Sequence, residues 1–263
     1  MTSPAPTTVP ADTGDDLALA LDAVTWGVGG FTIIDSVDLR VRRGEFLSII
    51  GPNGAGKSTL VNLVSGTYRP LSGTISLGSR AITGLPSHRR IRLGLGRTFQ
   101  TSSLFPSLTV LENARLSAQS SLGGSMNLLR APGRRDRAHE IAWHRLAEVD
   151  LAHRAGDRAA DLPYGEKRKL EIAVALCGSP QVLLLDEPTA GVSDGEVDSL
   201  IEVIRSVHRT GVTVVMVEHR MDFVVDVSDR ISVLQDGRIL MTGSPSEVMT
   251  DARVLSAYLG PDL

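Results

Sequence analysis

The sequence predicts an α/β fold with a helical segment inserted in its middle, and three observations support this class. Between residues 17 and 84, short β-type runs alternate with glycine-rich breaks. From about 101 to 175, apolar residues follow a helical spacing instead. From 181 onward, β-type and helical runs alternate again. We therefore expect one domain over residues 17–263, with a helical insert at approximately 101–175.

Individual elements follow from local patterns. Before the helical segment, the runs expected as strands are 39–42, 46–50 and 74–77. Inside it, Thr109 and Glu112 have the spacing of a capping box, and the spacing over 139–149 predicts an amphipathic helix. Residues 122–137 contain a Gly-Gly pair at 123–124 and a Pro-Gly pair at 132–133, and are expected to be an irregular insertion. Downstream we expect a strand at 182–185, a helix at 195–208, a strand at 212–217 and a hairpin turning at Asp236-Gly237.

Composition restricts the class of protein. The chain has 263 residues, 42% hydrophobic and 22% charged, which is typical of a soluble globular protein. Its apolar runs are far shorter than the ~20 residues that span a bilayer. The first 16 residues are rich in Pro, Thr, Ala and Asp, and predict a disordered tail rather than a signal peptide. The net charge of −3 argues against a nucleic-acid binder, and Cys177, the single cysteine, is expected to be buried.

The strongest motif is a glycine-rich loop between an apolar run at 46–50 and an amphipathic run at 60–64. It has the pattern G-x-x-x-x-G-K-[ST] and comprises Gly51, Pro52, Asn53, Gly54, Ala55, Gly56, Lys57, Ser58 and Thr59. Backbone N–H groups of such a loop wrap a polyphosphate, aided by the helix dipole. Lys57 is expected to reach the β- and γ-phosphates, and Ser58 to offer its hydroxyl to Mg²⁺. A chance match is the alternative, but the strand, the helix and a later acidic pair favour binding of a nucleoside triphosphate.

That acidic pair, Asp186 and Glu187, follows the apolar run 182–185. Ligands collect at the carboxyl ends of parallel strands, so both carboxylates are expected beside the phosphate loop. Asp186 is suited to hold Mg²⁺ through its water shell, and Glu187 to accept a proton from an attacking water or to orient it. Such carboxylates can also merely cap the next helix; their combination with the lysine loop favours the catalytic role.

Further segments resemble the ATP-binding subunits of ABC transporters, over nearly the whole chain from 17 to 259. They are the glutamine loop at 97–100, the crossing loop at 189–194, the switch histidine His219, and the signature formed by Leu162, Pro163, Tyr164, Gly165 and Glu166. The resemblance implies a P-loop NTPase (RecA-like) core with an antiparallel β subdomain and an inserted α-helical subdomain. It also implies that ATP and Mg²⁺ bind, that Gln100 completes the metal site, and that Glu187, His219 and Lys57 are catalytic.

Several segments are similar to one branch of this family, the ATPases of branched-chain (hydrophobic) amino-acid uptake. They are 96–100, 104–113, 162–166, 170–173, Gly191 and 257–260. We therefore expect the ATP-hydrolysing, energy-coupling subunit of an importer for branched-chain or other hydrophobic amino acids. A urea-type importer and a lipid or lipopolysaccharide exporter are alternatives, because their ATPases are near relatives. A soluble ABC ATPase acting on ribosomes or DNA is a remote alternative. Such proteins usually fuse two cassettes or carry long coiled-coil insertions, whereas this sequence has one cassette and no such insertion.

The resemblance also implies partners. Two ATPase subunits, alike or different, close head to tail around each ATP. The signature opens a helix expected from about 166 to 177, whose N–H groups face the γ-phosphate held by the other subunit. Transmembrane permease subunits dock a cytoplasmic helix between core and insert, and a solute-binding protein acts indirectly. The chain is accordingly expected at the cytoplasmic face of the cell membrane, as a peripheral protein that binds no nucleic acid.

Two residues depart from the family pattern, and one cluster of arginines is not explained by it. Pro163 replaces the usual signature serine and lacks its hydroxyl and N–H, so a working but weaker site is expected. Val28 stands where many relatives stack an aromatic on adenine, so base selectivity is expected to be loose unless Trp26 or Phe31 takes that place. Trp26 is expected to be ordinary packing. A cluster of arginines is expected to be a solvated loop, with anionic headgroups as its alternative ligand: Arg130, Arg134, Arg135 and Arg137.

Overall fold

The computed structural model describes residues 16–98, 104–122 and 136–259. The predicted tail apart from Asp16, the predicted metal ligand Gln100, and the clustered arginines Arg130, Arg134 and Arg135 lie outside these ranges. In the described ranges, every helix is too short or too polar to cross a membrane.

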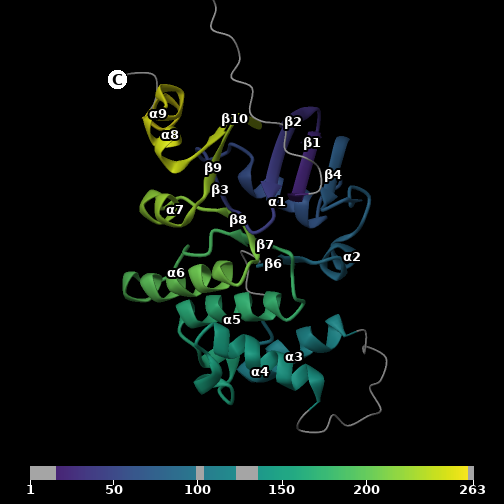
Figure 1. The fold of residues 1–263 in the computed structure, drawn as a ribbon, viewed down its shortest axis with the longest axis vertical. Coiled ribbons are helices and arrows are strands. Elements are labelled where there is room, and N and C mark those ends of the chain that lie inside the picture. Colours follow the sequence, from purple (N-terminus) through teal and green to yellow (C-terminus); the bar gives the residue numbers. More distant parts are fainter. Residues whose placement is uncertain (1–15, 99–103, 123–135, 260–263) are drawn as a thin grey trace, which may run out of the picture.

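A six-stranded sheet lies at the centre of the molecule (Figure 1). Its strands, in spatial order, are β10 (Arg238–Gly243), β9 (Arg230–Gln235), β3 (Phe46–Ile50), β8 (Thr213–Val217), β7 (Val182–Asp186) and β6 (Leu95–Arg97). Strands β9, β3, β8, β7 and β6 run parallel, and β3, β7 and β8 are buried along their whole length. Continuous apolar runs are typical of parallel strands covered on both faces, which explains why these strands could be recognised.

The edge strand β10 is antiparallel and forms the predicted hairpin with β9. Its two turn residues, Asp236 and Gly237, have φ angles of 48° and 76°. Two consecutive positive φ angles define the tight primed turn that Asp-Gly favours. The hairpin prediction is confirmed.

A second sheet of four antiparallel strands packs against this core. Its order is β2 (Phe31–Arg42), β1 (Leu17–Val28), β4 (Ser72–Leu77) and β5 (Arg80–Ala81). Buried residues of β1, β2 and β4 share one hydrophobic cluster with the helix α1 (Lys57–Ser65) and with alternate residues of β3. Helix α1 is therefore packed between the two sheets, with the loop that precedes it at their junction.

Helices gather beyond the other face of the parallel sheet, at one end of the molecule (Figure 1). In chain order they are α3 (Val110–Ser121), α4 (Arg137–Glu148) and α5 (Tyr164–Leu176), and the short 3₁₀ turns Ala152–Arg154 and Ala159–Asp161 lie between α4 and α5. Buried Ala114, Ala118 and Ala142 lie where α3 and α4 meet, and such small residues allow close approach. The remaining helices are α2 (Ser87–Arg92), α6 (Asp194–Arg209), α7 (Met221–Val227), α8 (Pro245–Thr250) and α9 (Ala252–Leu259).

The boundaries of α3 and α4 show how far local signals reach. The capping box is confirmed: Glu112 N donates to Thr109 Oγ1 at 3.1 Å, and Thr109 N donates to Glu112 Oε2 at 2.8 Å. Helix α4 begins at Arg137, so the assignment of this residue to the irregular loop is wrong. Its N-cap is Asp136, whose Oδ1 accepts from His139 N at 2.8 Å and satisfies the first turn.

Two side chains with ionisable groups, those of Cys177 and Arg90, are buried in the interior. Cys177 is buried as predicted, and this burial raises the pKa of its thiol to about 12. Arg90 of α2 is 1% exposed, and its guanidinium donates to four backbone carbonyls at 2.7–3.0 Å, those of Leu63, Val64, Thr83 and Leu85. Burial lowers the pKa of Arg90 to about 10. This arginine therefore fastens α2 to the carboxyl end of α1.

We expect Arg90→Met to lower the free energy of unfolding by about 3–5 kcal/mol, because it leaves buried carbonyl groups without donors. Urea denaturation followed by circular dichroism measures this change. The matched control is Arg89→Met, one residue earlier on the same helix, where the side chain is exposed and the expected change is within about 0.5 kcal/mol. Equal midpoints for the two variants would contradict the fastening role.

Candidate functional site

The glycine-rich loop joins β3 to α1, and two of its glycines are required by contacts with neighbouring residues. A Cβ on Gly51 would lie 2.0 Å from Leu234 O, and one on Gly56 would lie 2.8 Å from Ile34 Cδ1. Gly54 and Gly56 also have φ angles of 82° and 101°, which side chains disfavour. Gly56 is the N-cap of α1, and the first turn of this helix contains no acidic residue. An electropositive helix end therefore faces the space above the loop.

Lys57 is the first residue of α1 and its ammonium group turns back over the loop. Its Nζ donates to Gly51 O at 2.7 Å and to Pro52 O at 2.9 Å. Burial lowers the pKa of Lys57, and the charges of Glu187 and Asp186 oppose this effect. The structure thus brings the lysine within electrostatic range of both carboxylates, although the motifs are far apart in the sequence.

Asp186 ends β7 and is 2% exposed. The Nη2 of Arg97 lies 3.6 Å from its Oδ2, and within the described chain neither carboxylate oxygen has a hydrogen-bond partner. Burial raises the pKa of Asp186, the Arg97 charge opposes this rise, and the neighbouring Glu187 charge adds to it. A buried carboxylate with such oxygens is a suitable cation ligand.

Glu187 directly follows β7 in an unusual conformation. Its φ is 50°, a left-handed value that costs a non-glycine residue about 1–3 kcal/mol. Glu187 N donates to Val217 O at 2.9 Å, which holds the strained backbone against the end of β8. Its Oε1 lies 3.1 Å from His219 Nε2, and both side chains are partly exposed. The predicted pair of Glu187 and His219 is therefore in direct contact at the open end of the sheet.

A residue to which the sequence assigned no role of its own, Glu218, organises the two loops around this pair. Its side chain is buried; Oε1 accepts from the hydroxyl and the backbone N–H of Thr189, and Oε2 accepts from His219 N at 2.9 Å. Glu218 thus ties the loop after Glu187 to the segment that carries His219. Its position directly after the apolar run 212–217 is the same strand-end signal that identified Asp186 and was the available clue.

The signature residues lie at the start of α5, which begins at Tyr164, about two residues earlier than predicted. Leu162 is buried, whereas Pro163 is the N-cap residue and makes no side-chain cap hydrogen bond. A Cβ on Gly165 would lie 2.9 Å from Glu196 Cβ of α6, so glycine is required there by packing within this chain.

The remaining signature side chains have intramolecular partners. Tyr164 lies against Gly191 of the crossing loop, since a Cβ added to Gly191 would lie 3.2 Å from Cε1 of Tyr164. The hydroxyl of Tyr164 accepts from Arg168 Nη2 at 2.8 Å, and Glu166 Oε2 accepts from Arg154 Nε at 3.1 Å. The exposed part of the signature is thus held by α6, by the crossing loop and by the turn before α5.

Of the aromatic residues near the predicted base site, Trp26 is packed against another ring. Its ring stacks on Tyr68 with centroids 4.7 Å apart and planes at 4°, so the prediction of ordinary packing is confirmed. Val28 and Phe31 flank the hairpin turn between β1 and β2 and are 61% and 78% exposed. Trp26 is therefore engaged elsewhere, and Phe31 is the exposed aromatic next to Val28.

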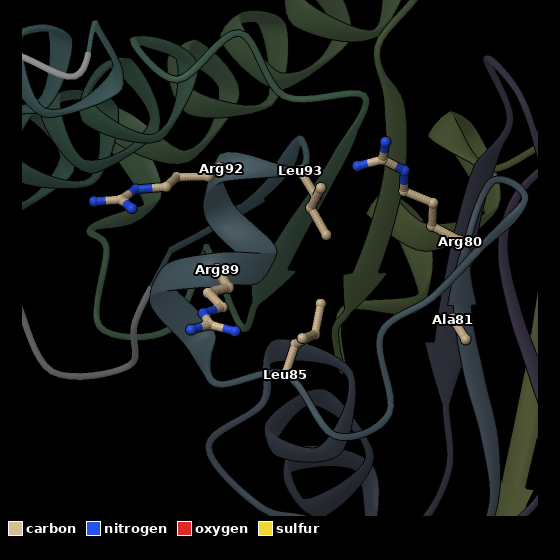
Figure 2. Close-up of a pocket in the computed structure, with 6 residues that line it drawn as sticks. All are labelled: Arg80, Ala81, Leu85, Arg89, Arg92 and Leu93. Atoms are coloured by element: carbon tan, nitrogen blue, oxygen red, sulfur yellow. The ribbon is translucent and has the colours of Figure 1, made fainter.

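Two hollows adjoin α2. A cavity of about 440 Å³ lies where α2 and β6 meet α3 and α5, and its lining includes Ile91, Arg97, Phe105, Leu116 and Glu171. The second is an open crevice between β5 and α2 (Figure 2), where Leu85 and Leu93 point toward one another. The guanidinium groups of Arg80, Arg89 and Arg92 spread around that crevice rather than converging on one point. The first hollow lies between the core and the helices.

Known proteins of similar sequence and structure show the family of this chain. The family model described as ABC transporter matches residues 34–190. The high-affinity branched-chain amino acid transport ATP-binding protein LivG of Salmonella typhimurium is 39% identical over 251 residues, which is 92% of this chain and 97% of LivG.

Two of the solved structures that are similar to this chain are both ATP-binding cassettes. An ATP-binding cassette of an ABC transporter in its ADP conformation superimposes with a TM-score of 0.81 at 28% identity, covering 93% of this chain and 99% of that cassette. A dimeric cassette in a post-hydrolysis state with ADP and Pi superimposes with a TM-score of 0.72 at 25% identity, covering 86% and 98%. The predicted fold class, a P-loop core with an antiparallel β subdomain and an α-helical subdomain, is confirmed. The chain belongs to the ABC transporter family, as one of its ATP-binding cassettes.

Proposed function

We propose that this protein is the ATP-hydrolysing, energy-coupling subunit of an importer for branched-chain or other hydrophobic amino acids. The observation that carries the proposal is the similarity to LivG, which extends over almost the full length of both proteins. The similarity therefore extends beyond the nucleotide motifs. Those motifs are shared by all cassettes and would not by themselves indicate the substrate. A urea-type importer or a lipid exporter remains the alternative for the transported substrate.

The phosphate loop is proposed to bind the ATP phosphates through its backbone N–H groups, with Lys57 moving from the loop carbonyls to the β- and γ-phosphates. Asp186 and the Ser58 hydroxyl fit Mg²⁺, because the buried Asp186 carboxylate lies near the loop and its oxygens have no hydrogen-bond partner among the described residues. Within the described residues, no three His, Cys, Asp or Glu side chains cluster as a metal cage. When bound, Mg²⁺ supplies charge neutralisation. Gln100 stays a proposed further ligand.

Glu187 is proposed to accept the proton of the attacking water or to orient it, and His219 to hold the carboxylate in place and sense the γ-phosphate. The support is their 3.1 Å contact at the open end of the sheet. Glu218 positions both, because it bonds to the backbone of His219 and to Thr189 two residues after Glu187. Hydrolysis needs little covalent help beyond such positioning and charge neutralisation.

Dimerisation is proposed to complete each site. The start of α5 is exposed at Pro163 and Tyr164, and a helix of 13 residues places an electropositive end there. In a head-to-tail dimer this end faces the γ-phosphate bound to the other subunit. A second ATPase subunit, identical or related, is therefore a proposed partner.

The permease is proposed to dock in the cavity between α2 and α3. Exposed Ile91, Phe105 and Leu116 line it, and such an apolar groove suits the cytoplasmic helix of a membrane partner. We accordingly propose that the protein is a peripheral subunit at the cytoplasmic face of the membrane, and that a solute-binding protein acts indirectly across it. Nucleic acid is not a proposed partner.

We expect Pro163→Ser to raise the ATPase rate of the assembled transporter by about ten- to a hundredfold at most. A serine hydroxyl could donate to a phosphate oxygen, and one hydrogen bond to a charged group contributes about 1.5–3 kcal/mol. Steady-state phosphate release from the purified complex measures this effect. A thousandfold increase would show that the proline site barely works, contrary to the proposal.

The function itself is tested by its partners. A tagged Glu187→Gln protein is expressed, membranes are solubilised with ATP present, and co-purifying proteins are identified by mass spectrometry. Two multi-spanning permeases and a second short ATPase support the importer, and their binding protein identifies the solute. An unrelated membrane assembly with this ATPase alone supports the exporter, and ribosomal or DNA-repair proteins overturn the transport assignment.

A further inference from the structure

Arg97, the last residue of β6, connects three parts of the molecule with one side chain. It belongs to an edge strand that pairs with β7, yet its side chain is only 8% exposed. Nη1 donates to Ser65 Oγ at 2.6 Å and to Thr67 Oγ1 at 3.2 Å. Nη2 lies 3.6 Å from Asp186 Oδ2. Arg97 also lines the cavity proposed to receive the permease.

The contacts at Ser65 and Thr67 fix the direction of the guanidinium. Ser65 is the last residue of α1, and Thr67 follows its C-cap, so Nη1 is held at the electronegative end of the helix. A guanidinium is planar and rigid, so anchoring one nitrogen fixes where the other points. Here the second nitrogen points toward the carboxylate of Asp186.

The carboxylate of Asp186 lies against this guanidinium. Among the described residues neither of its oxygens has a hydrogen-bond partner, and Arg97 forms an ion pair with Oδ2. A buried carboxylate without hydrogen bonds is otherwise free to turn about its χ2 angle, which is a broad torsion. Metal ligands are generally held by a second layer of contacts, and removing these costs about 10- to 100-fold in metal affinity.

We propose that Arg97 is a positioning residue for Asp186: anchored on the end of α1, it holds the carboxylate in the orientation that receives Mg²⁺ with ATP. This inference rests on the proposed role of Asp186 as a ligand of the Mg²⁺ shell. It adds that the metal site is built on the carboxyl end of α1 as well as on the phosphate loop at its amino end. It also places the support of the metal site on the wall of the docking groove.

Binding measurements separate this role from a merely structural ion pair. ATP affinity of the purified full-length chain is measured by isothermal titration calorimetry, once with Mg²⁺ and once with EDTA. Arg97→Gln is expected to weaken binding about tenfold with Mg²⁺ and to leave it within about twofold with EDTA. Arg97→Lys, which keeps the charge but loses the fork, is expected to recover part of the loss.

Ser65→Ala provides a second variant that leaves Arg97 in place and disturbs the fold little. Because it removes the 2.6 Å anchor, we expect about a threefold loss that is again confined to Mg²⁺. An Arg97→Gln protein with wild-type affinity in Mg²⁺, or with the same loss in EDTA, overturns the inference. So does a Ser65→Ala loss that is as large in EDTA as in Mg²⁺.

Asp186→Asn distinguishes failure of this inference from failure of the proposed function. If Asp186→Asn keeps the wild-type difference between Mg²⁺ and EDTA, the metal role of Asp186 is wrong and the inference falls with it. If Asp186→Asn abolishes the difference whereas Arg97→Gln retains it, only the role of Arg97 is wrong. A smaller difference than in the wild type in both variants, with partial recovery in Arg97→Lys, supports both.

Discussion

Glu187→Gln is expected to lower kcat of the assembled ATPase by about 10²- to 10⁴-fold while ATP binding is retained. The amide has nearly the shape of the carboxylate and tolerates the same left-handed backbone, but it cannot accept a proton from water. Its contact with His219 Nε2, at 3.1 Å, can persist with the other histidine tautomer. Phosphate release by the reconstituted complex and ATP affinity by calorimetry measure the two expectations separately.

Glu202→Gln is the control for this experiment, because Glu202 is an exposed carboxylate on α6 that pairs with Arg209 and Arg205. Its kcat is expected to equal that of the wild type. If Glu187→Gln keeps more than a tenth of the wild-type kcat, Glu187 does not act on the water. If it instead abolishes ATP binding, the strained turn was being held by the carboxylate.

Lys57→Met is expected to weaken ATP binding by about 10- to 10⁴-fold and to abolish hydrolysis at ordinary ATP concentrations. One or two charge-assisted hydrogen bonds to phosphate oxygens are lost, each of about 1.5–3 kcal/mol. Calorimetric titration of the purified chain with ATP measures the affinity directly. The thermal midpoint without nucleotide reports whether the loop survives loss of the bonds to Gly51 O and Pro52 O.

Lys57→Arg is the informative companion. The buried ammonium fits between two carbonyls of the loop, whereas a planar guanidinium is larger and has a different donor geometry. Because the substituted side chain keeps the charge but not this fit, we expect Lys57→Arg to be nearly as defective as Lys57→Met. Wild-type affinity in Lys57→Arg would show that charge alone is needed, and that the position of Nζ over the loop is incidental.

The parts of the fold that depend on neighbouring residues could be predicted from the sequence. The capping box of α3 and the hairpin at Asp236-Gly237 are fixed within a few residues, and both were confirmed. The start of α4 was wrong because the loop pattern before it concealed Asp136, whose capping role depends on one side chain.

The contacts that organise the site could not be predicted in this way. The bonds between Thr189 and Glu218 join residues 29 positions apart, and Arg97 reaches both the end of α1 and the end of β7. Residue spacing identifies strand ends, but it does not show which side chains meet once the strands are ordered in a sheet. Motifs therefore predict the chemistry of single residues, whereas the order of the strands in the sheet determines which residues contact them.

The contact between Tyr164 and Gly191 has a consequence for two bound nucleotides. Gly191 lies four residues after Glu187 on the same loop, and Tyr164 stands at the start of the helix that a neighbouring subunit's nucleotide would meet. In the proposed head-to-tail dimer, a shift of this loop after cleavage at one bound nucleotide would displace the surface offered to the other nucleotide. Cross-talk between the two halves of that dimer would then need no route through the membrane.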